Sequence, residues 1–176
     1  MTKKIAMLLA SDKFRDIEYI VPRAFFEQYG CIVKTMSSTQ LSVGRFGFKV
    51  QNDMLLQEIN VADFDGIYMV GGGGSLQYLD NILVKQIFEK FLDQNKPIAA
   101  ICAAPRNFLK WGLLNDKMAT GFDGDGEFSI MAVTYGAKGM PEESVVIDGL
   151  ILTANGPKAS EESAIEYLKL LNIYHS

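Results

Sequence analysis

The sequence predicts an α/β protein whose central sheet is mostly parallel. Three short apolar runs have the composition of fully buried strands: KIAMLLA at 4–10, GIYMV at 66–70 and PIAAI at 97–101. Segments with the apolar spacing of amphipathic helices alternate with these runs, which is typical of βαβ units. A hairpin signature around Asp148-Gly149, near the end of the chain, adds an antiparallel pair of strands.

The first helix is predicted to run from Asp16 to about Tyr29. Asp16 is a residue type that caps helices, and Gly30 is suited to close this one. Pro22 lies inside the predicted helix, where a proline removes one backbone N–H donor. We therefore expect Pro22 to delay the start of the helix or to kink it.

The other elements are predicted from apolar runs and alternation, which indicate strands, and from apolar residues three or four apart, which indicate helices. Before the third buried strand we expect a polar loop at 11–16, a strand at 31–37, short strands around residues 43–50, a brief helix at 55–59, and helical segments at 75–79 and 82–91. After the helix that Gly112 ends, we expect a short strand at 118–122, a glycine-rich acidic loop at 121–129, and a last helix beginning at Ser160 with Ala164, Ile165, Leu168 and Leu171 facing the core.

Composition narrows the class of protein. We expect residues 1–176 to form one domain, since the chain is long enough for one extensive core. A net charge of −4 without a basic cluster argues against nucleic-acid binding, and no apolar run is long enough to span a membrane.

The start of the chain is predicted to be a strand, not a signal peptide. Two distant cysteines, Cys31 and Cys102, indicate neither a disulfide framework nor a zinc site, so we expect a cytoplasmic protein.

Cys102 is the candidate nucleophile. It follows the strand at 97–101 and precedes Ala103, Ala104 and Pro105, so it lies on a sharp turn into a helix. Unpaired N–H groups at a helix start carry partial positive charge, which favours the thiolate. The alternative is that Cys102 is a small buried hydrophobic residue.

Three strands lead to one edge of the predicted sheet, where ligands bind in open α/β folds. The first strand leads toward Glu18, the second to Gly71–Gly74 and the third to Cys102. The glycines would let backbone N–H groups approach a developing oxyanion, and the amide of Ala103 could act as a second donor. Glu18 could move a proton to or from a substrate on the sulfur, or it could be a solvated carboxylate near a helix start.

Four segments carry a resemblance to a known family. They are DIEYIVP with Glu18, GGGGSLQYL, AAICAAP with Cys102, and DGLILTANGP before the last helix. In this order they resemble the ThiJ/PfpI superfamily, specifically the branch that contains the Parkinson-associated protein deglycase. The similarity covers almost the whole chain, and AAICAAP together with DGLILTANGP is its most specific part.

The resemblance implies a flavodoxin-like three-layer sandwich with a late β-hairpin, and a homodimer. It implies that Cys102 lies on a nucleophile elbow in a strained backbone conformation and that a protonated Glu18 hydrogen-bonds its sulfur. By position, Gly72 matches an oxyanion donor of the family. Arg45 matches an arginine that reaches the neighbouring subunit's site, although an ordinary surface arginine is the alternative. Arg106 could add positive potential for the thiolate or could be exposed.

One departure from the family concerns histidine. Family enzymes usually pair the cysteine with a histidine, but Ala103 follows Cys102 here and the stretch at 135–144 contains none. His175 is the single histidine of the chain and is expected to lie in a frayed tail. A Cys-His dyad within the subunit is therefore not expected, and neither is peptidase chemistry.

Two functions remain open at this point. The first is a cysteine-dependent enzyme of glyoxalase or deglycase type, which acts on small reactive aldehydes through Cys102 and Glu18. The alternative is a redox-sensing or stress-protective protein whose Cys102 is oxidised to a sulfinate. We expect no cofactor: Gly71–Gly74 lacks the spacing of nucleotide-binding loops. We also expect no metal, because the acids at 123–127 lack the calcium-loop pattern.

Overall fold

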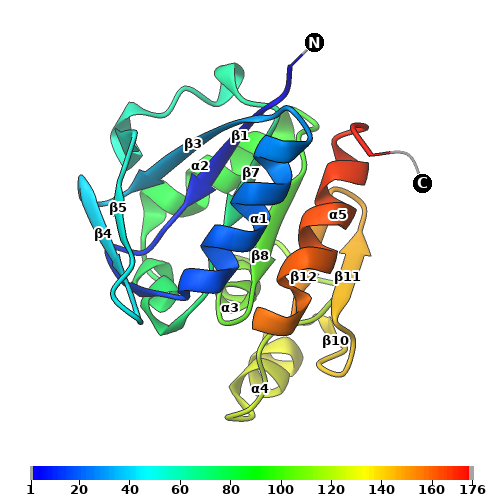
Figure 1. Ribbon diagram of the computed structural model, residues 1–176. Helices are drawn as coiled ribbons and strands as arrows, with labels where there is room; N and C mark the ends of the chain where they lie inside the picture. Colours follow the sequence, from blue (N-terminus) through cyan, green and yellow to red (C-terminus); the bar gives the residue numbers. More distant parts are fainter. Residues whose placement is uncertain (1, 175–176) are drawn as a thin grey trace.

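The structure, a computed structural model, describes residues 2–174 and has three layers, with helices on both faces of a central sheet (Figure 1). The seven strands of this sheet are β1 (Lys4–Leu8), β3 (Ile32–Ser37), β6 (Met54–Leu55), β7 (Gly66–Met69), β8 (Ile98–Ile101), β11 (Val145–Asp148) and β12 (Ile151–Ala154). Their order is β11-β12-β8-β7-β1-β3-β6, and every neighbouring pair is parallel except β11 with β12. The predicted α/β class, the mostly parallel sheet of a flavodoxin-like sandwich and the late hairpin are confirmed.

The main helices that cover the two faces of the sheet can be followed in Figure 1. They are α1 (Asp16–Gln28) and α5 (Ser160–Leu170) on one face, and α2 (Ile82–Asp93) and α3 (Pro105–Lys110) on the other. Alternate side chains of β1 point to opposite faces of the sheet. Ile5 and Met7 pack toward α1 and α5, whereas Ala6 and Leu8 pack toward α2 and α3. Burial on both faces explains why the strands are continuous apolar runs in the sequence.

Helix α1 begins at Asp16 and continues through Pro22 to Gln28. The expectation that Pro22 delays its start is therefore wrong. Pro22 lies on the buried face of the helix together with Tyr19 and Phe26. Packing of this face against the sheet offsets the one backbone hydrogen bond that a proline removes.

A second, three-stranded sheet lies beside the main one. It consists of β2 (Asp12–Phe14), β4 (Leu41–Gly44) and β5 (Lys49–Gln51), in the order β2-β4-β5. The strands β4 and β5 confirm the short strands expected around residues 43–50. Strand β2 falls within the segment predicted to be a loop, so that part of the prediction is wrong.

The predicted role of Asp16 as a helix cap is also wrong. Arg15 occupies the N-cap position of α1 and makes no side-chain capping hydrogen bond. The carboxylate of Asp16 instead accepts backbone N–H bonds from Phe46 and Phe48, each at 3.0 Å. A Cβ on Gly44 would lie 2.4 Å from Oδ1 of Asp16, so glycine lets this buried carboxylate reach the turn between β4 and β5.

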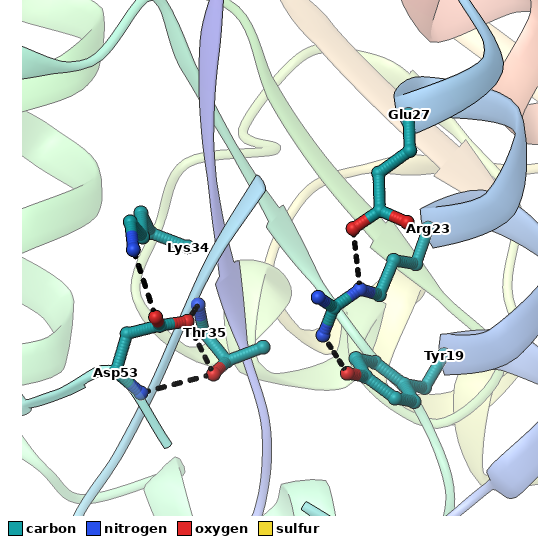
Figure 2. A network of polar contacts seen from close by, with 6 residues as sticks. All are labelled: Tyr19, Arg23, Glu27, Lys34, Thr35 and Asp53. Atoms are coloured by element: carbon teal, nitrogen blue, oxygen red, sulfur yellow. Dashed lines mark hydrogen bonds and ion pairs between the residues drawn. The ribbon is translucent and has the colours of Figure 1, made fainter. Parts of the chain in front are cut away.

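Figure 2 shows two separate groups of polar contacts, one on α1 and one between β3 and Asp53. On α1, Arg23 donates to Glu27 at 2.8 Å and to the hydroxyl of Tyr19. Beside β3, the carboxylate of Asp53 accepts from the ammonium of Lys34 at 2.9 Å. It also accepts from the backbone amide and the hydroxyl of Thr35. Exposed ion pairs such as these contribute only about 0–1 kcal/mol each, so the fold depends mainly on the buried apolar layers.

The remaining elements are short. They are the 3-10 helices η1 (Leu56–Glu58), η2 (Val61–Asp63), η3 (Gly73–Tyr78) and η4 (Pro157–Ala159), helix α4 (Glu127–Thr134), and the paired strands β9 (Met118–Ala119) and β10 (Lys138–Gly139). The loop predicted through residue 129 is wrong from Glu127 onward. In α5, Ile165 is only half-buried, and Tyr167 is fully buried in the core instead. None of the helices within residues 2–174 combines the length and the apolar character needed to cross a membrane.

Candidate functional site

Cys102 lies on the turn between β8 and α3, where the sequence predicts it. Its φ is +64°, an unusual value for a residue with a side chain. Two backbone hydrogen bonds hold this conformation: the amide of Cys102 donates to the carbonyl of Ala154 at 2.8 Å, and its carbonyl accepts from the amide of Phe122 at 2.7 Å. A strained backbone of this kind costs about 1–3 kcal/mol and persists only where its surroundings fix it.

Glu18 lies in the first turn of α1 and is completely buried. Neither of its carboxyl oxygens has a hydrogen bond of regular geometry, although the thiol of Cys102 and the amide of Gly71 lie close enough to influence its ionisation. Burial raises the pKa of Glu18 to about 8, against the opposing effects of Cys102, the charge of Arg15 and the amide of Gly71. The carboxyl group is therefore mostly protonated at neutral pH, and it is not the solvated carboxylate of the alternative interpretation.

Glycines after β7 allow the carboxyl group and the thiol to meet. A Cβ on Gly71 would lie 2.3 Å from the carbonyl oxygen of Ile101, 2.4 Å from Oε2 of Glu18 and 2.7 Å from Cβ of Cys102. Gly72 has a φ of +93°, and a Cβ there would collide with the backbone before α1. Close packing at Gly71 and Gly72 explains why glycine is needed here, whereas the predicted approach of their N–H groups to an oxyanion stays a prediction.

The amides of Gly72 and Ala103 lie close enough to the sulfur of Cys102 to lower the pKa of its thiol. Larger effects oppose them. Burial and then the charge of Glu18 raise the pKa of Cys102 to about 12. The start of the helix was predicted to favour the thiolate, but the net shift of the thiol pKa is upward, so this prediction is wrong. At neutral pH the thiol of Cys102 keeps its proton, and the carboxyl group of Glu18 mostly does.

The sulfur lies at a cavity of about 320 Å³. The cavity is lined by Arg15, Arg45, Gly72, Gly73, Leu76, Cys102, Ala103, Arg106, Phe122, Asp125 and Pro157. Cys102 itself is 9% exposed, so it is largely buried but still borders open space. A wider groove of about 720 Å³ adjoins the cavity and shares Arg15, Phe122 and Pro157 with it.

Three arginines border this cavity. Arg106 is only 5% exposed, donates to the carbonyl of Phe122 at 2.9 Å and pairs with Asp125. Arg45 lines the cavity of its own chain. Arg15 stacks over the ring of Phe46, 5.0 Å from its centroid. Sequence reasoning did not single out Arg15; its place three residues before Glu18, directly ahead of α1, was the available signal.

Other residues considered in the sequence lie elsewhere. Asp123 accepts from the amide of Ser129 at 2.9 Å and from its hydroxyl, so it is engaged within its own loop. Cys31 is buried away from the cavity, and burial raises the pKa of its thiol to about 11. His175 lies outside the described residues. Within 2–174 the structure contains no cluster of three or more acidic, cysteine or histidine side chains suited to a metal ion.

Comparisons with known proteins show similarity over almost the whole chain. A model of the DJ-1/PfpI family matches residues 3–170. An uncharacterized protein of Methanocaldococcus jannaschii is 32% identical over 173 residues, which cover 96% of this chain and 82% of that protein. The deglycase PfpI of Pyrococcus furiosus is 27% identical, over 94% of this chain and 98% of its own length. The crystal structure of a ThiJ/PfpI domain protein from Brachyspira murdochii superposes with a TM-score of 0.91, at 27% identity and over 99% of both chains.

Proposed function

Since this chain belongs to the DJ-1/PfpI family, we propose that it converts small reactive aldehydes, in the manner of a glyoxalase or deglycase, with Cys102 as nucleophile and Glu18 as proton shuttle. Relatives named as deglycases, such as the one from Pyrococcus furiosus, support a deglycase-like or stress-protective role at the family level. The observation that carries the proposal for this chain is the contact of a buried, protonatable Glu18 with a thiol that borders a cavity.

The first step is addition of the thiol to the aldehyde carbon. In the ionised fraction of the site, the Glu18 carboxylate takes the thiol proton as the carbon–sulfur bond forms. The electron pair of the carbonyl moves to the aldehyde oxygen, which then receives the proton from Glu18. The product is a hemithioacetal on Cys102. The amides of Gly72 and Ala103 are suited to stabilise the oxygen while it carries negative charge.

The next steps convert the hemithioacetal of a 2-oxoaldehyde into a hydroxyacid. The Glu18 carboxylate removes the proton from the former aldehyde carbon and returns it to the neighbouring carbonyl carbon. The hydroxyl proton of the hemithioacetal passes to the oxygen of that carbonyl, so the products are a thioester and a new hydroxyl group. One carbon is oxidised and its neighbour is reduced, so no external oxidant is needed. Water then cleaves the thioester, its hydroxyl joining the carbon and its proton the sulfur. Methylglyoxal would give lactate.

A carboxyl group with a pKa of about 8 suits both directions of this transfer, because it holds and releases a proton near physiological pH. The mechanism requires no histidine. It also requires no acid for an amine leaving group, which a peptidase would need. The site therefore supports aldehyde chemistry better than peptide hydrolysis.

The test is conversion of methylglyoxal to lactate by the wild type and by Cys102→Ala, with the mass of the thiol recorded beforehand to exclude prior oxidation. We expect product from the wild type only. Lactate formation at the same rate by Cys102→Ala would eliminate the proposal. Cys31→Ala is the matched control, because Cys31 lies outside the cavity, and it should retain the wild-type rate.

The second candidate is oxidation of Cys102 to a sulfinate, in which two molecules of hydrogen peroxide each deliver one oxygen atom and leave as water. The protonated carboxyl of Glu18 favours this outcome, because it could donate a hydrogen bond to the sulfinate. Peroxide titration with peptide mass mapping distinguishes this role. Oxygen added to the Cys102 peptide without any methylglyoxal turnover supports it, and oxidation confined to Cys31 counts against it.

The proposal includes a homodimer, which the family resemblance implies, and a cytoplasmic location. Ile17 and Ile20 support an interface on α1, since both are apolar and more than 40% exposed, at 47% and 41%. Light scattering during size-exclusion chromatography measures the mass directly. A monomer at micromolar concentration would contradict this part of the proposal.

A further inference from the structure

The charges around the cavity at Cys102 have a sign opposite to that of the whole chain. The chain carries a net charge of −4, yet three arginines line this cavity against one carboxylate, that of Asp125. Glu18 lies behind the sulfur and is mostly protonated at neutral pH, so it removes little of this positive charge. The cavity is a local cationic site on an acidic protein.

Two of the arginines are not fully satisfied by protein partners. Arg106 is 5% exposed, and its Nε is buried without a hydrogen bond although the side chain also binds Phe122 and Asp125. The Nε of Arg15 is likewise buried without a partner. Carboxylate and phosphate oxyanions are the ligands that guanidinium groups pair with best, and Arg15 and Arg106 both line the cavity.

The wider groove next to the cavity does not extend this positive field. Its charged residues are of both signs: Arg15 and Lys158 are basic, and Asp123 and Glu142 are acidic. The excess of positive charge is therefore concentrated at the thiol and not spread along the approach to it. A small anionic group would be held next to the reacting sulfur.

We propose that the cavity selects aldehydes that carry a carboxylate or phosphate group, with Arg15, Arg45 and Arg106 as the recognition residues. This inference rests on the proposed function and names its substrate class. A neutral dicarbonyl such as methylglyoxal then reacts more slowly than an acidic aldehyde of similar size. Selectivity comes from the arginines, whereas the chemistry is that of Cys102 and Glu18.

The first experiment compares alkylation of Cys102 by iodoacetate, which is anionic, and iodoacetamide, which is neutral and nearly the same size. We expect the ratio of the two rate constants to exceed the ratio for free cysteine by about ten-fold at low ionic strength. High salt should reduce the ratio, since it screens the arginines. Arg45→Met and Arg15→Met should also reduce it. Arg23→Met is the matched control, because it removes one positive charge from α1 outside the cavity.

A ratio equal to that of free cysteine, unchanged by salt and by the two cavity substitutions, would overturn the inference. This readout does not need turnover, so it separates failure of the anion site from failure of the proposed enzyme. If neither reagent modifies Cys102, a second measurement decides. Cys102→Ser labelled with ¹⁵N is titrated with inorganic phosphate, acetate and acetamide.

Saturable shifts of the amides of Gly72, Ala103 and Phe122 with the two anions, and not with acetamide, support the inference. A larger response to phosphate identifies phosphate-bearing aldehydes as the preferred substrates. A larger response to acetate identifies carboxylated aldehydes instead. Absence of a response to both anions, or an equal response to acetamide, contradicts the anion site.

Discussion

Oε2 of Glu18 occupies the space that a side chain at Gly71 would need, since a Cβ there would lie 2.4 Å away. Gly71→Ala should therefore displace the carboxyl group or the Cys102 turn, and we expect a loss of stability together with a changed reactivity of the thiol. Urea unfolding and the rate of Cys102 alkylation measure the two effects. Gly73→Ala is the control for stability, because Gly73 is exposed and nothing lies within 4 Å of its Cβ position. A Gly71→Ala variant as stable as Gly73→Ala, with the thiol reactivity of the wild type, would contradict this relationship.

The raised pKa of Glu18 makes the stability of the protein depend on pH. The folded protein keeps this proton up to a pKa of about 8, whereas the unfolded chain releases it near 4.5. The free energy of unfolding should therefore fall as pH rises between these two values, by up to about 5 kcal/mol. Glu18→Gln cannot ionise and should not show this fall. Urea unfolding at a series of pH values tests the difference, and parallel curves for the two proteins would refute it.

The pH dependence of Cys102 alkylation reports how Glu18 acts on the thiol. After burial, the charge of Glu18 is the largest cause that raises the pKa of Cys102. Glu18→Gln removes this charge and should shift the rate profile for iodoacetamide to lower pH. A shift to higher pH would instead mean that Glu18 acts mainly as a hydrogen-bond donor that stabilises the thiolate.

Asp16 positions the turn that carries Arg45 and Phe46. Asp16→Asn replaces one acceptor oxygen by a donor, so one of the two backbone N–H groups loses its bond, at a cost of about 1–3 kcal/mol. We expect faster hydrogen exchange at Phe46 and Phe48 and a weaker preference of Cys102 for iodoacetate. Asp12→Asn, an exposed acid on β2, is the control and should change neither. Unchanged exchange in Asp16→Asn would exclude the positioning role.

The sequence predicted the central sheet and the turn at Cys102 because both depend on local patterns. A short apolar run followed by small residues and a proline indicates strand, turn and helix without knowledge of the rest of the chain. The glycines after β7 were likewise interpretable, since close backbone approach is a property of glycine itself. Local signals of this kind located Glu18 and Cys102 at one edge of the sheet.

What the sequence did not predict depends on distant contacts. Asp16 is a residue type that often caps helices, but its hydrogen-bond partners are the amides of Phe46 and Phe48, some 30 residues later in the β4–β5 turn. The thiol pKa was expected to fall because the helix start is visible in the sequence, whereas burial of the sulfur beside Glu18 is not. Arg15, Arg45 and Arg106 are far apart in the chain, so their common cavity emerges only from the fold.

The most direct test of the Glu18–Cys102 pair is the rate of lactate formation from methylglyoxal by the wild type and by Glu18→Gln, measured side by side with both thiols verified as reduced. Loss of a general acid–base group typically lowers the rate 10²–10⁴-fold, and we expect a loss of about that size. Equal rates for the two proteins would contradict the account, because the proton transfer would then not pass through Glu18.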